Sequence, residues 1–303
     1  MSEPILHHYD VSPYAEKVRL MFGLKGLAWK SVQIPMIMPK PDLTCLTGGY
    51  RKTPVLQVGA DVYCDTKTIA RALERLAPDP TLYPANTEAT ERGLSLVADT
   101  MFMAGVVALL GEGLFPQDFV EDRQKMIPGG FDPATAKRAV PAKLDQLRGY
   151  LAALDAQLAD GRDYLLADEV SLADLSVYNP VSFLQMAPIT AGLATGLAHL
   201  DAWRGRIASI GHGERVEIDS TEAIETARNA EPATETAVDP GEPNGYRAGD
   251  TITVMPEDYG MDPVTGTLVY SDPWEIAVRR HDDRVGDVVV HFPRQGYLTF
   301  RAG

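Results

Sequence analysis

The hydrophobic period of the chain changes twice, and each change marks a different kind of structure. Residues 4–77 alternate strand-like and helix-like patterns. Residues 87–213 follow the helical period alone, with leucines separated by steps of three and four residues. The leucines of this stripe are Leu144, Leu147, Leu151, Leu154 and Leu158. After residue 244 the pattern becomes short runs rich in β-branched residues between Gly, Pro and Asp, which is typical of strands. The five predicted strands are "DTITVMP", "GTLVYS", "EIAVRRH", "DVVVHFP" and "GYLTFR".

These periods predict an α/β domain, an all-α helical bundle and a small all-β barrel or sandwich module. We place the α/β domain at residues 1–80 and the all-α domain at residues 87–230, with "STEAIETARNA" as its last helix. The stretch "EPATETAVDPGEPNG" is rich in Pro, Glu, Ala and Thr, so residues 231–244 are predicted to be a linker. Residues 245–303 form the β module, which contains no lysine.

Charge and cysteine content limit the partners and the compartment. A net charge of −14 repels phosphate, so nucleic acid and anionic membrane surfaces are poor partners. The most apolar segment, residues 94–110, carries Asp99 and is shorter than the ~20 residues that span a bilayer, so we expect a buried helix. Two cysteines, Cys45 and Cys64, are too few for a disulfide framework, and the chain starts without a signal-like leader. We therefore expect a cytoplasmic protein.

Ser12 stands where the strand-like run "PILHHY" gives way to a helical pattern. The first turn of a helix offers unpaired N–H groups and about half a positive charge, so it stabilises a nearby anion. A thiol with a reference pKa near 8.5 can fall to ~3.5–7.5 in such a place. A serine hydroxyl adds one hydrogen-bond donor. Serine is also among the commonest helix N-caps, so the residue alone leaves a cap or a thiolate partner open.

Two further motifs lie downstream of Ser12. In "KTPVL", a cis bond between Thr53 and Pro54 would leave the Thr53 backbone free to pair with an extended, peptide-like ligand. Asp65 and Thr66 begin the helix after "VYC", where Thr66 and the helix N–H groups can bind a carboxylate and Asp65 an ammonium. One carboxylate and one ammonium on the same carbon form an amino-acid head group. The three motifs together predict a site for a small thiol peptide.

The stretches "SPYAEKVRL", "TPVLQVG" and Asp65-Thr66 resemble the serine-type branch of the cytosolic glutathione S-transferases. The resemblance covers about residues 4–213 and implies a thioredoxin-like domain followed by an all-α domain. Within the all-α part, "SLADLSVY" looks like the capping motif of that family and "LDAWRGRIASI" like its late Trp-containing helix. The resemblance also implies a homodimer and glutathione as co-substrate. We expect no metal cofactor, because the sequence has no set of ligands at metal spacing.

The resemblance assigns a role to each motif. Ser12 donates its hydroxyl hydrogen bond to the glutathione thiolate. The Thr53 backbone pairs with the cysteinyl unit beside cis-Pro54, and Asp65 and Thr66 hold the γ-glutamyl head group. Two positions depart from the family pattern, with Asp65 where Glu is commoner and Thr53 where Val or Ile is usual. The shorter aspartate is expected to weaken the hold on the ligand ammonium.

Other residues keep open alternatives. Either Lys40, in the Pro-rich loop, or Lys52 is expected to bind the glycine carboxylate, and both are equally well explained as surface lysines. Tyr9 is a second choice for the thiolate partner. His7 and His8 are expected to be packing or surface residues, because the sequence has no set of ligands at metal spacing.

The sequence therefore predicts a glutathione transferase whose thiolate attacks a small hydrophobic electrophile. Met101, Phe102, Phe115 and Phe183 are candidates for the electrophile pocket. One alternative is a glutathione-dependent lyase, isomerase or peroxidase on the same fold. Another is a non-catalytic binding or scaffold protein whose β module contacts a partner.

Overall fold

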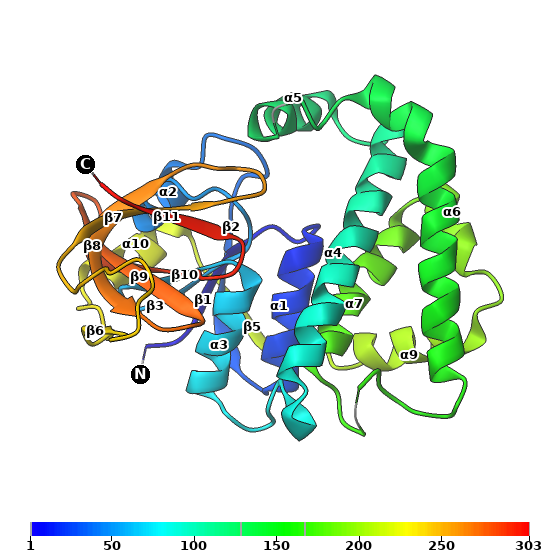
Figure 1. Ribbon diagram of the computed structural model, residues 1–303, viewed down its shortest axis with the longest axis horizontal. Helices are drawn as coiled ribbons and strands as arrows, with labels where there is room; N and C mark the ends of the chain where they lie inside the picture. The colour runs from blue at the N-terminus through cyan, green and yellow to red at the C-terminus, as the bar shows by residue number, and fades with distance from the viewer. Residues whose placement is uncertain (1, 128, 167, 303) are drawn as a thin grey trace. The chain divides into compact units, whose positions relative to one another are not determined.

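The structure is a computed structural model that describes residues 2–127, 129–166 and 168–302 (Figure 1). The chain forms two compact units. The sheet unit comprises Met1–Val18, Gly26–Leu76 and Glu214–Gly303. The helical unit comprises Arg19–Lys25 and Ala77–Gly213, so the division falls within the first helix.

The sheet unit contains every strand that the described residues form, together with four helices. Its strands are β1 (Ile5–His8), β2 (Ala28–Gln33), β3 (Val55–Val58), β4 (Asp61–Cys64), β5 (Glu214–Glu217), β6 (Ala237–Val238), β7 (Thr251–Pro256), β8 (Val264–Ser271), β9 (Glu275–Asp282), β10 (Gly286–Pro293) and β11 (Tyr297–Arg301). Its helices are α1 (Pro13–Leu24), of which the first half belongs here, α2 (Pro41–Thr47), α3 (Thr66–Leu76) and α10 (Ser220–Arg228).

Among the described residues these strands form one sheet in the order β11-β7-β8-β9-β10-β4-β3-β1-β2-β5, with β6 paired to β8. The thioredoxin-like part is β4-β3-β1-β2, in which β1 and β2 are parallel and β3 is antiparallel to both β1 and β4. On one side β5 pairs in parallel with β2, and on the other side β10 pairs in parallel with β4. The five strands predicted after residue 244 are therefore present, and they continue the thioredoxin-like sheet.

The predicted boundaries at residues 230 and 244 do not coincide with the division between the units. Helix α10, which we expected at the end of the all-α domain, belongs to the sheet unit and packs on α2, β2 and β10. The C-terminal strands share one apolar core with the first strands, in which Val62 of β4 packs with Ile224 of α10 and Val290 of β10. Residues 231–244 include β6, which pairs with β8. The physical reason is the β10–β4 pairing, which joins the predicted β module to the sheet edge.

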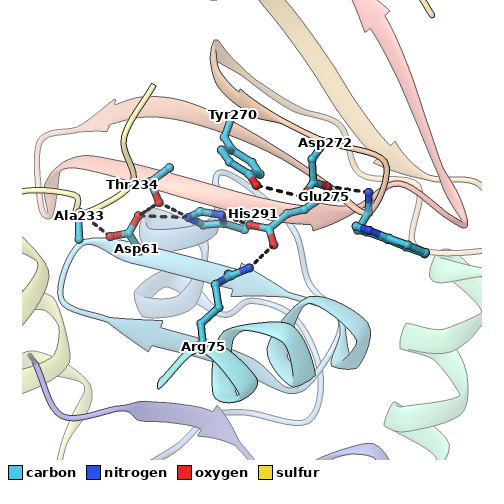
Figure 2. A network of polar contacts seen from close by, with 9 residues as sticks. Asp61, Arg75, Ala233, Thr234, Tyr270, Asp272, Glu275 and His291 are labelled. Atoms are coloured by element: carbon cyan, nitrogen blue, oxygen red, sulfur yellow. Dashed lines mark hydrogen bonds and ion pairs between the residues drawn. The ribbon is translucent and has the colours of Figure 1, made fainter. Parts of the chain in front are cut away.

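A buried polar network crosses the β10–β4 pairing (Figure 2). His291 of β10 lies between Asp61 of β4 and Glu275 of β9, with its Nε2 atom 3.1 Å from Asp61 and its Nδ1 atom 2.6 Å from Glu275. Arg75 of α3 binds the other oxygen of Glu275 at 3.0 Å, and the Thr234 hydroxyl donates to Asp61 at 2.6 Å. The network thus connects four secondary-structure elements and residue 234.

Close packing also joins α2 to the C-terminal strands. Gly48 ends α2 in the left-handed region, with φ of 77°. A Cβ atom at this position would lie 2.7 Å from the Arg280 side chain and 3.0 Å from Val264. The helix end therefore needs glycine both for its backbone conformation and for the space that β8 and β9 occupy.

The helical unit is built on two long helices, α4 (Glu88–Gly111) and α6 (Pro133–Leu158), which pack on one another; α7 (Leu172–Phe183) packs on α4 (Figure 1). Its other helices are α5 (Gln117–Met126), α8 (Pro188–Ala191) and α9 (Ala198–Ala208), with short 3₁₀ turns at Pro84–Asn86, Leu184–Met186 and Gly192–Ala194. Ser171 and Asp174 form the predicted capping box at the start of α7. Asp174 also accepts a hydrogen bond from Trp203 Nε1 at 2.9 Å, which joins α7 to the Trp-containing helix α9.

Helix α4 is long and apolar enough to cross a membrane, with a mean hydropathy of 1.9 over its best window. Length and composition alone do not separate a membrane span from the core helix of a water-soluble protein. In this structure α4 packs against α6 and α7.

Candidate functional site

One end of the sheet brings together three segments that are far apart in the sequence. In the β1–β3 pair His7 lies opposite Val55, and in the β3–β4 pair the same Val55 lies opposite Cys64. The end of β1, the start of β3 and the end of β4 therefore form one row. Because neighbouring strands are about 5 Å apart, the row is about 10 Å wide. The three predicted motifs occupy the segments that adjoin these strand ends.

Ser12 is buried at the start of α1, directly before Pro13. Its hydroxyl oxygen accepts a hydrogen bond from the backbone N–H of Ala15 at 3.2 Å, and its carbonyl oxygen accepts from Glu16 at 3.0 Å. Ser12 is therefore the N-cap of α1. A hydroxyl that accepts one hydrogen bond still carries a proton to donate, so the cap remains able to serve as the donor to a sulfur.

The Thr53–Pro54 peptide bond is cis, as the resemblance implied, and it lies directly before β3. The buried ammonium of Lys40 donates to the carbonyl oxygen of Arg51 at 3.2 Å and to the Thr53 hydroxyl at 3.3 Å. Lys40 is therefore not a solvated surface lysine. It supports the loop that presents the Thr53 backbone.

Asp65 lies between β4 and α3 in the left-handed region, with φ of 77°, a conformation that aspartate tolerates better than most residues. Its Oδ1 atom accepts a hydrogen bond from the Lys67 N–H at 3.0 Å, so Asp65 caps α3. Its Oδ2 atom accepts from the Tyr297 hydroxyl at 3.2 Å. A carboxylate has about four acceptor positions, so these two donors leave room for an ammonium. Thr66 is buried as the first residue of α3.

Lys52 is paired with the C-terminal part of the chain. Its Nζ atom lies 2.5 Å from Asp258 Oδ1 and 4.1 Å from the ring centroid of Tyr259. Both partners lie in the loop between β7 and β8. Asp258, Tyr259 and Tyr297 are site neighbours that the sequence motifs did not reveal.

Two helices begin at this end of the sheet, because α1 follows β1 and α3 follows β4. Each helix N-terminus carries about half a positive charge on its unpaired N–H groups. The arrangement therefore favours two anions, one beside Ser12 and one beside Thr66. A cation is favoured at the Asp65 carboxylate.

Comparisons with known proteins identify the family of this chain. The family models of the glutathione S-transferase N-terminal and C-terminal domains match residues 6–81 and 98–210. A solved GST-like protein from Pseudomonas syringae is 40% identical with a TM-score of 0.83, and the match covers 99% of this chain and 100% of that one. The chain belongs to the glutathione S-transferase family.

Other solved structures share the fold over a smaller part of this chain than the P. syringae protein does. A glutathione S-transferase from Methylobacillus flagellatus, solved with glutathione bound, is 20% identical with a TM-score of 0.54 and covers 69% of this chain and 99% of its own. The β-etherase LigF from Sphingobium sp. strain SYK-6 is 18% identical with a TM-score of 0.53 and covers 68% and 95%. About a third of this chain thus has no counterpart in these two structures, whereas the P. syringae protein matches nearly all of it. A search of curated proteins gave no match.

The cysteines and the N-terminal histidines of this family member are packing residues. Cys45 and Cys64 are free and buried, and burial raises the pKa of both thiols, which disfavours the thiolate form of each. Burial lowers the pKa of His7 to about 4, and its ring is hydrogen-bonded to Gln57 at 2.9 Å. His8 is hydrogen-bonded to Ser31 at 2.9 Å. In the part of the chain that the structure describes, no group of three or more His, Cys, Asp or Glu residues is placed to hold a metal ion.

The residues predicted for the electrophile pocket are mostly core residues of the helical unit. Met101 and Phe183 are buried, and Phe102 and Phe115 pack half-buried against the apolar cluster of that unit. The helical unit has a separate open hollow of about 460 Å³ beside α4. It is lined by Leu96, Asp99, Thr100, Met103, Ala104, Val107 and Lys143. None of the four predicted residues lines this hollow.

Proposed function

We propose that this protein is a glutathione transferase that forms the glutathione thiolate at Ser12 and uses it to attack a small hydrophobic electrophile. The observation that carries this function is the row formed by His7, Val55 and Cys64. Along that row Ser12, the Thr53 backbone and Asp65 follow one another in strand order. This is the order of the thiol, the cysteinyl peptide and the γ-glutamyl head group of glutathione.

Each residue has a definite task in this function. The Ser12 hydroxyl donates to the sulfur, and the N-terminus of α1 stabilises the negative charge, so the thiol loses its proton at a lower pH. The thiolate is the nucleophile, and its lone pair forms the new carbon–sulfur bond. With an aryl halide, the carbon–halogen bond then breaks and the halide leaves with the bonding electron pair. Asp65 holds the ammonium of the γ-glutamyl group, and Thr66 with the N-terminus of α3 holds its carboxylate. Support comes from the family membership and from the helix starts at Ser12 and Thr66.

Replacement of Ser12 by alanine tests the central step. A hydrogen bond to a charged group contributes about 1.5–3 kcal/mol, and one pKa unit equals about 1.4 kcal/mol. We therefore expect the pKa of bound glutathione to rise by about 1–2 units and conjugation of an aryl halide to fall by about 10-fold to 100-fold near neutral pH. Tyr9→Phe is the matched control, because Tyr9 is the other candidate for the thiolate partner. Unchanged turnover in Ser12→Ala, or an equal loss in Tyr9→Phe, would contradict the role of Ser12.

The same site is compatible with related chemistry. A thiolate held in this way also serves a lyase, an isomerase or a peroxidase, and a β-etherase shares the fold. Turnover assays with aryl halides, aryl ethers and hydroperoxides separate these reactions. Retention on immobilised glutathione without turnover of any of them would favour a binding or scaffold protein. We also propose that the protein is cytoplasmic and forms a homodimer. Light scattering after size-exclusion chromatography tests the homodimer, and cell fractionation tests the location.

A further inference from the structure

The proposed glutathione-binding site, called the thiol site below, comprises Ser12, Lys52, Thr53, Asp65 and Thr66. The C-terminal strands and their loops contact this site at both of its ends. Tyr297 of β11 donates its hydroxyl to Asp65, and Asp258 of the β7–β8 loop pairs with Lys52. The backbone N–H of Glu257 donates to the carbonyl oxygen of Gly296 at 3.0 Å, which ties the β7–β8 loop to the turn before β11. Residues beyond position 244 therefore reach the residues assigned to the γ-glutamyl end and to the glycine end of glutathione.

The ammonium of Lys52 already has an anionic partner. It lies 2.5 Å from the Asp258 carboxylate and against the ring of Tyr259. The Lys52 side chain is 13% exposed, whereas the Asp258 side chain is 54% exposed. Asp258 can therefore move into water more easily than Lys52 can change its position. The other candidate, Lys40, is buried and hydrogen-bonded to the loop before β3, so Lys52 is the lysine that a ligand can reach.

A ligand carboxylate at Lys52 meets Asp258 as a like charge. Two carboxylates at one ammonium repel each other, so the glycine carboxylate of glutathione either binds beside Asp258 at an electrostatic cost or displaces it. A carboxamide in the same place is uncharged and leaves the Lys52–Asp258 pair intact. Glu257 and Asp262 add further negative charge to the same loop.

We propose that Asp258 is a specificity-determining residue of the thiol site, which it biases away from a free C-terminal carboxylate. The favoured ligands are γ-glutamyl thiol peptides whose glycine end is an amide. This role rests on the proposed function, because it requires a glutathione-like thiol to bind at Ser12, Thr53 and Asp65. It goes beyond that function by naming the ligand class and the part of the chain that selects it.

Isothermal titration calorimetry with glutathione and with glutathione amide tests this role. We expect Asp258→Asn to bind glutathione about fivefold more tightly than the wild type, the upper range for an exposed ion pair. Its affinity for the amide should stay within about twofold of the wild type, because the amide does not compete for Lys52. Asp262→Asn is the matched control, since it removes the same charge from the same loop, and it should leave both affinities within about twofold.

An unchanged or weaker affinity for glutathione in Asp258→Asn would overturn this role. An equal gain in Asp262→Asn would overturn it as well, because the effect would then belong to the loop charge as a whole. In a Lys52→Met background, Asp258→Asn should give no gain, since Asp258 acts through Lys52. A wild-type protein that binds neither thiol refutes the proposed function itself. One that binds both thiols without any response to Asp258→Asn refutes only the selection by Asp258.

Discussion

Replacing His291 with phenylalanine tests what holds the C-terminal strands against β4. His291 is 1% exposed, and its two ring nitrogens are hydrogen-bonded to the buried carboxylates of Asp61 and Glu275. Phenylalanine keeps an aromatic ring, slightly larger than imidazole, that can stack on Tyr63, whose ring centroid lies 4.3 Å from that of His291, but it removes both donors. Arg75 then remains as the one cation of the network. Removing one partner of a buried ion pair costs about 3–5 kcal/mol, so we expect the free energy of unfolding to fall by about that amount.

The loss should depend on pH. Burial lowers the pKa of His291, but its hydrogen bonds to Asp61 and Glu275 and their charges outweigh this and raise the pKa above 6.5. For Asp61 and Glu275, burial raises the pKa of the carboxyl group. The hydrogen bond and the positive charge of His291, together with their other partners, outweigh burial, so both pKa values lie below their ordinary values. A raised histidine pKa stabilises the fold below about pH 6.5, and this contribution disappears as the pH rises through the folded-state pKa. A lowered carboxyl pKa stabilises the fold above about pH 4.5, and this contribution disappears as the pH falls through the folded-state pKa.

The difference between wild type and His291→Phe should therefore be largest between about pH 4.5 and 6.5 and smaller at about pH 9. Urea unfolding followed by circular dichroism measures it. His281→Phe is the matched control, because His281 lies 2.7 Å from Asp287 but is 65% exposed, and exposed ion pairs contribute about 0–1 kcal/mol. A loss in His291→Phe no larger than in His281→Phe, or a loss that does not change with pH, would refute the reasoning.

Two further predictions concern the C-terminal strands. Removal of residues 240–303 should leave a poorly soluble or unfolded sheet unit, because the removed strands share the core of that unit. We do not expect an active enzyme with a changed substrate range. Size-exclusion chromatography and circular dichroism measure the outcome. Tyr297→Phe should weaken glutathione binding about fivefold in calorimetry, since the lost hydroxyl orients Asp65 at 3.2 Å and such a hydrogen bond contributes about 1 kcal/mol. Tyr246→Phe, which removes a hydroxyl bonded to Thr299 in the same sheet, should leave binding unchanged, and an equal effect of both variants would contradict the role of Tyr297.

Features with a local pattern could be predicted from the sequence. The five strands after residue 244 follow from short runs rich in β-branched residues between turn residues, and each was expected within about two residues of its observed bounds. The capping box is likewise a local pattern, in which Ser171 stands three residues before Asp174. The motifs at Ser12, Thr53 and Asp65 are recognisable because each adjoins the end of a strand.

Contacts between distant strands could not be predicted in this way. The pairing of β10 with β4 aligns His291 with Tyr63, and nothing near either residue specifies the other. One signal was available: "DVVVHFP" is apolar at consecutive positions, which is typical of a strand buried on both faces and unlike the alternating strand of a small exposed barrel. Because that pairing was not foreseen, neither were its consequences, which are the polar network around His291 and the contacts of Asp258 and Tyr297 with the site.

The same pairing gives the C-terminal strands two roles that experiments can separate. Without β10, β4 would be an edge strand with unpaired N–H and C=O groups, which favour unwanted association. β10 pairs with that edge directly before Asp65. Beyond β10 in the sheet order, the β7–β8 loop places Asp258 against Lys52, and β11 places Tyr297 against Asp65. His291→Phe alters the pairing and leaves Asp258 in the chain, whereas Asp258→Asn leaves the pairing and alters one exposed charge. A change of ligand preference in the second variant without a change in stability would therefore show that selection is a property of the loop and not a by-product of covering the edge.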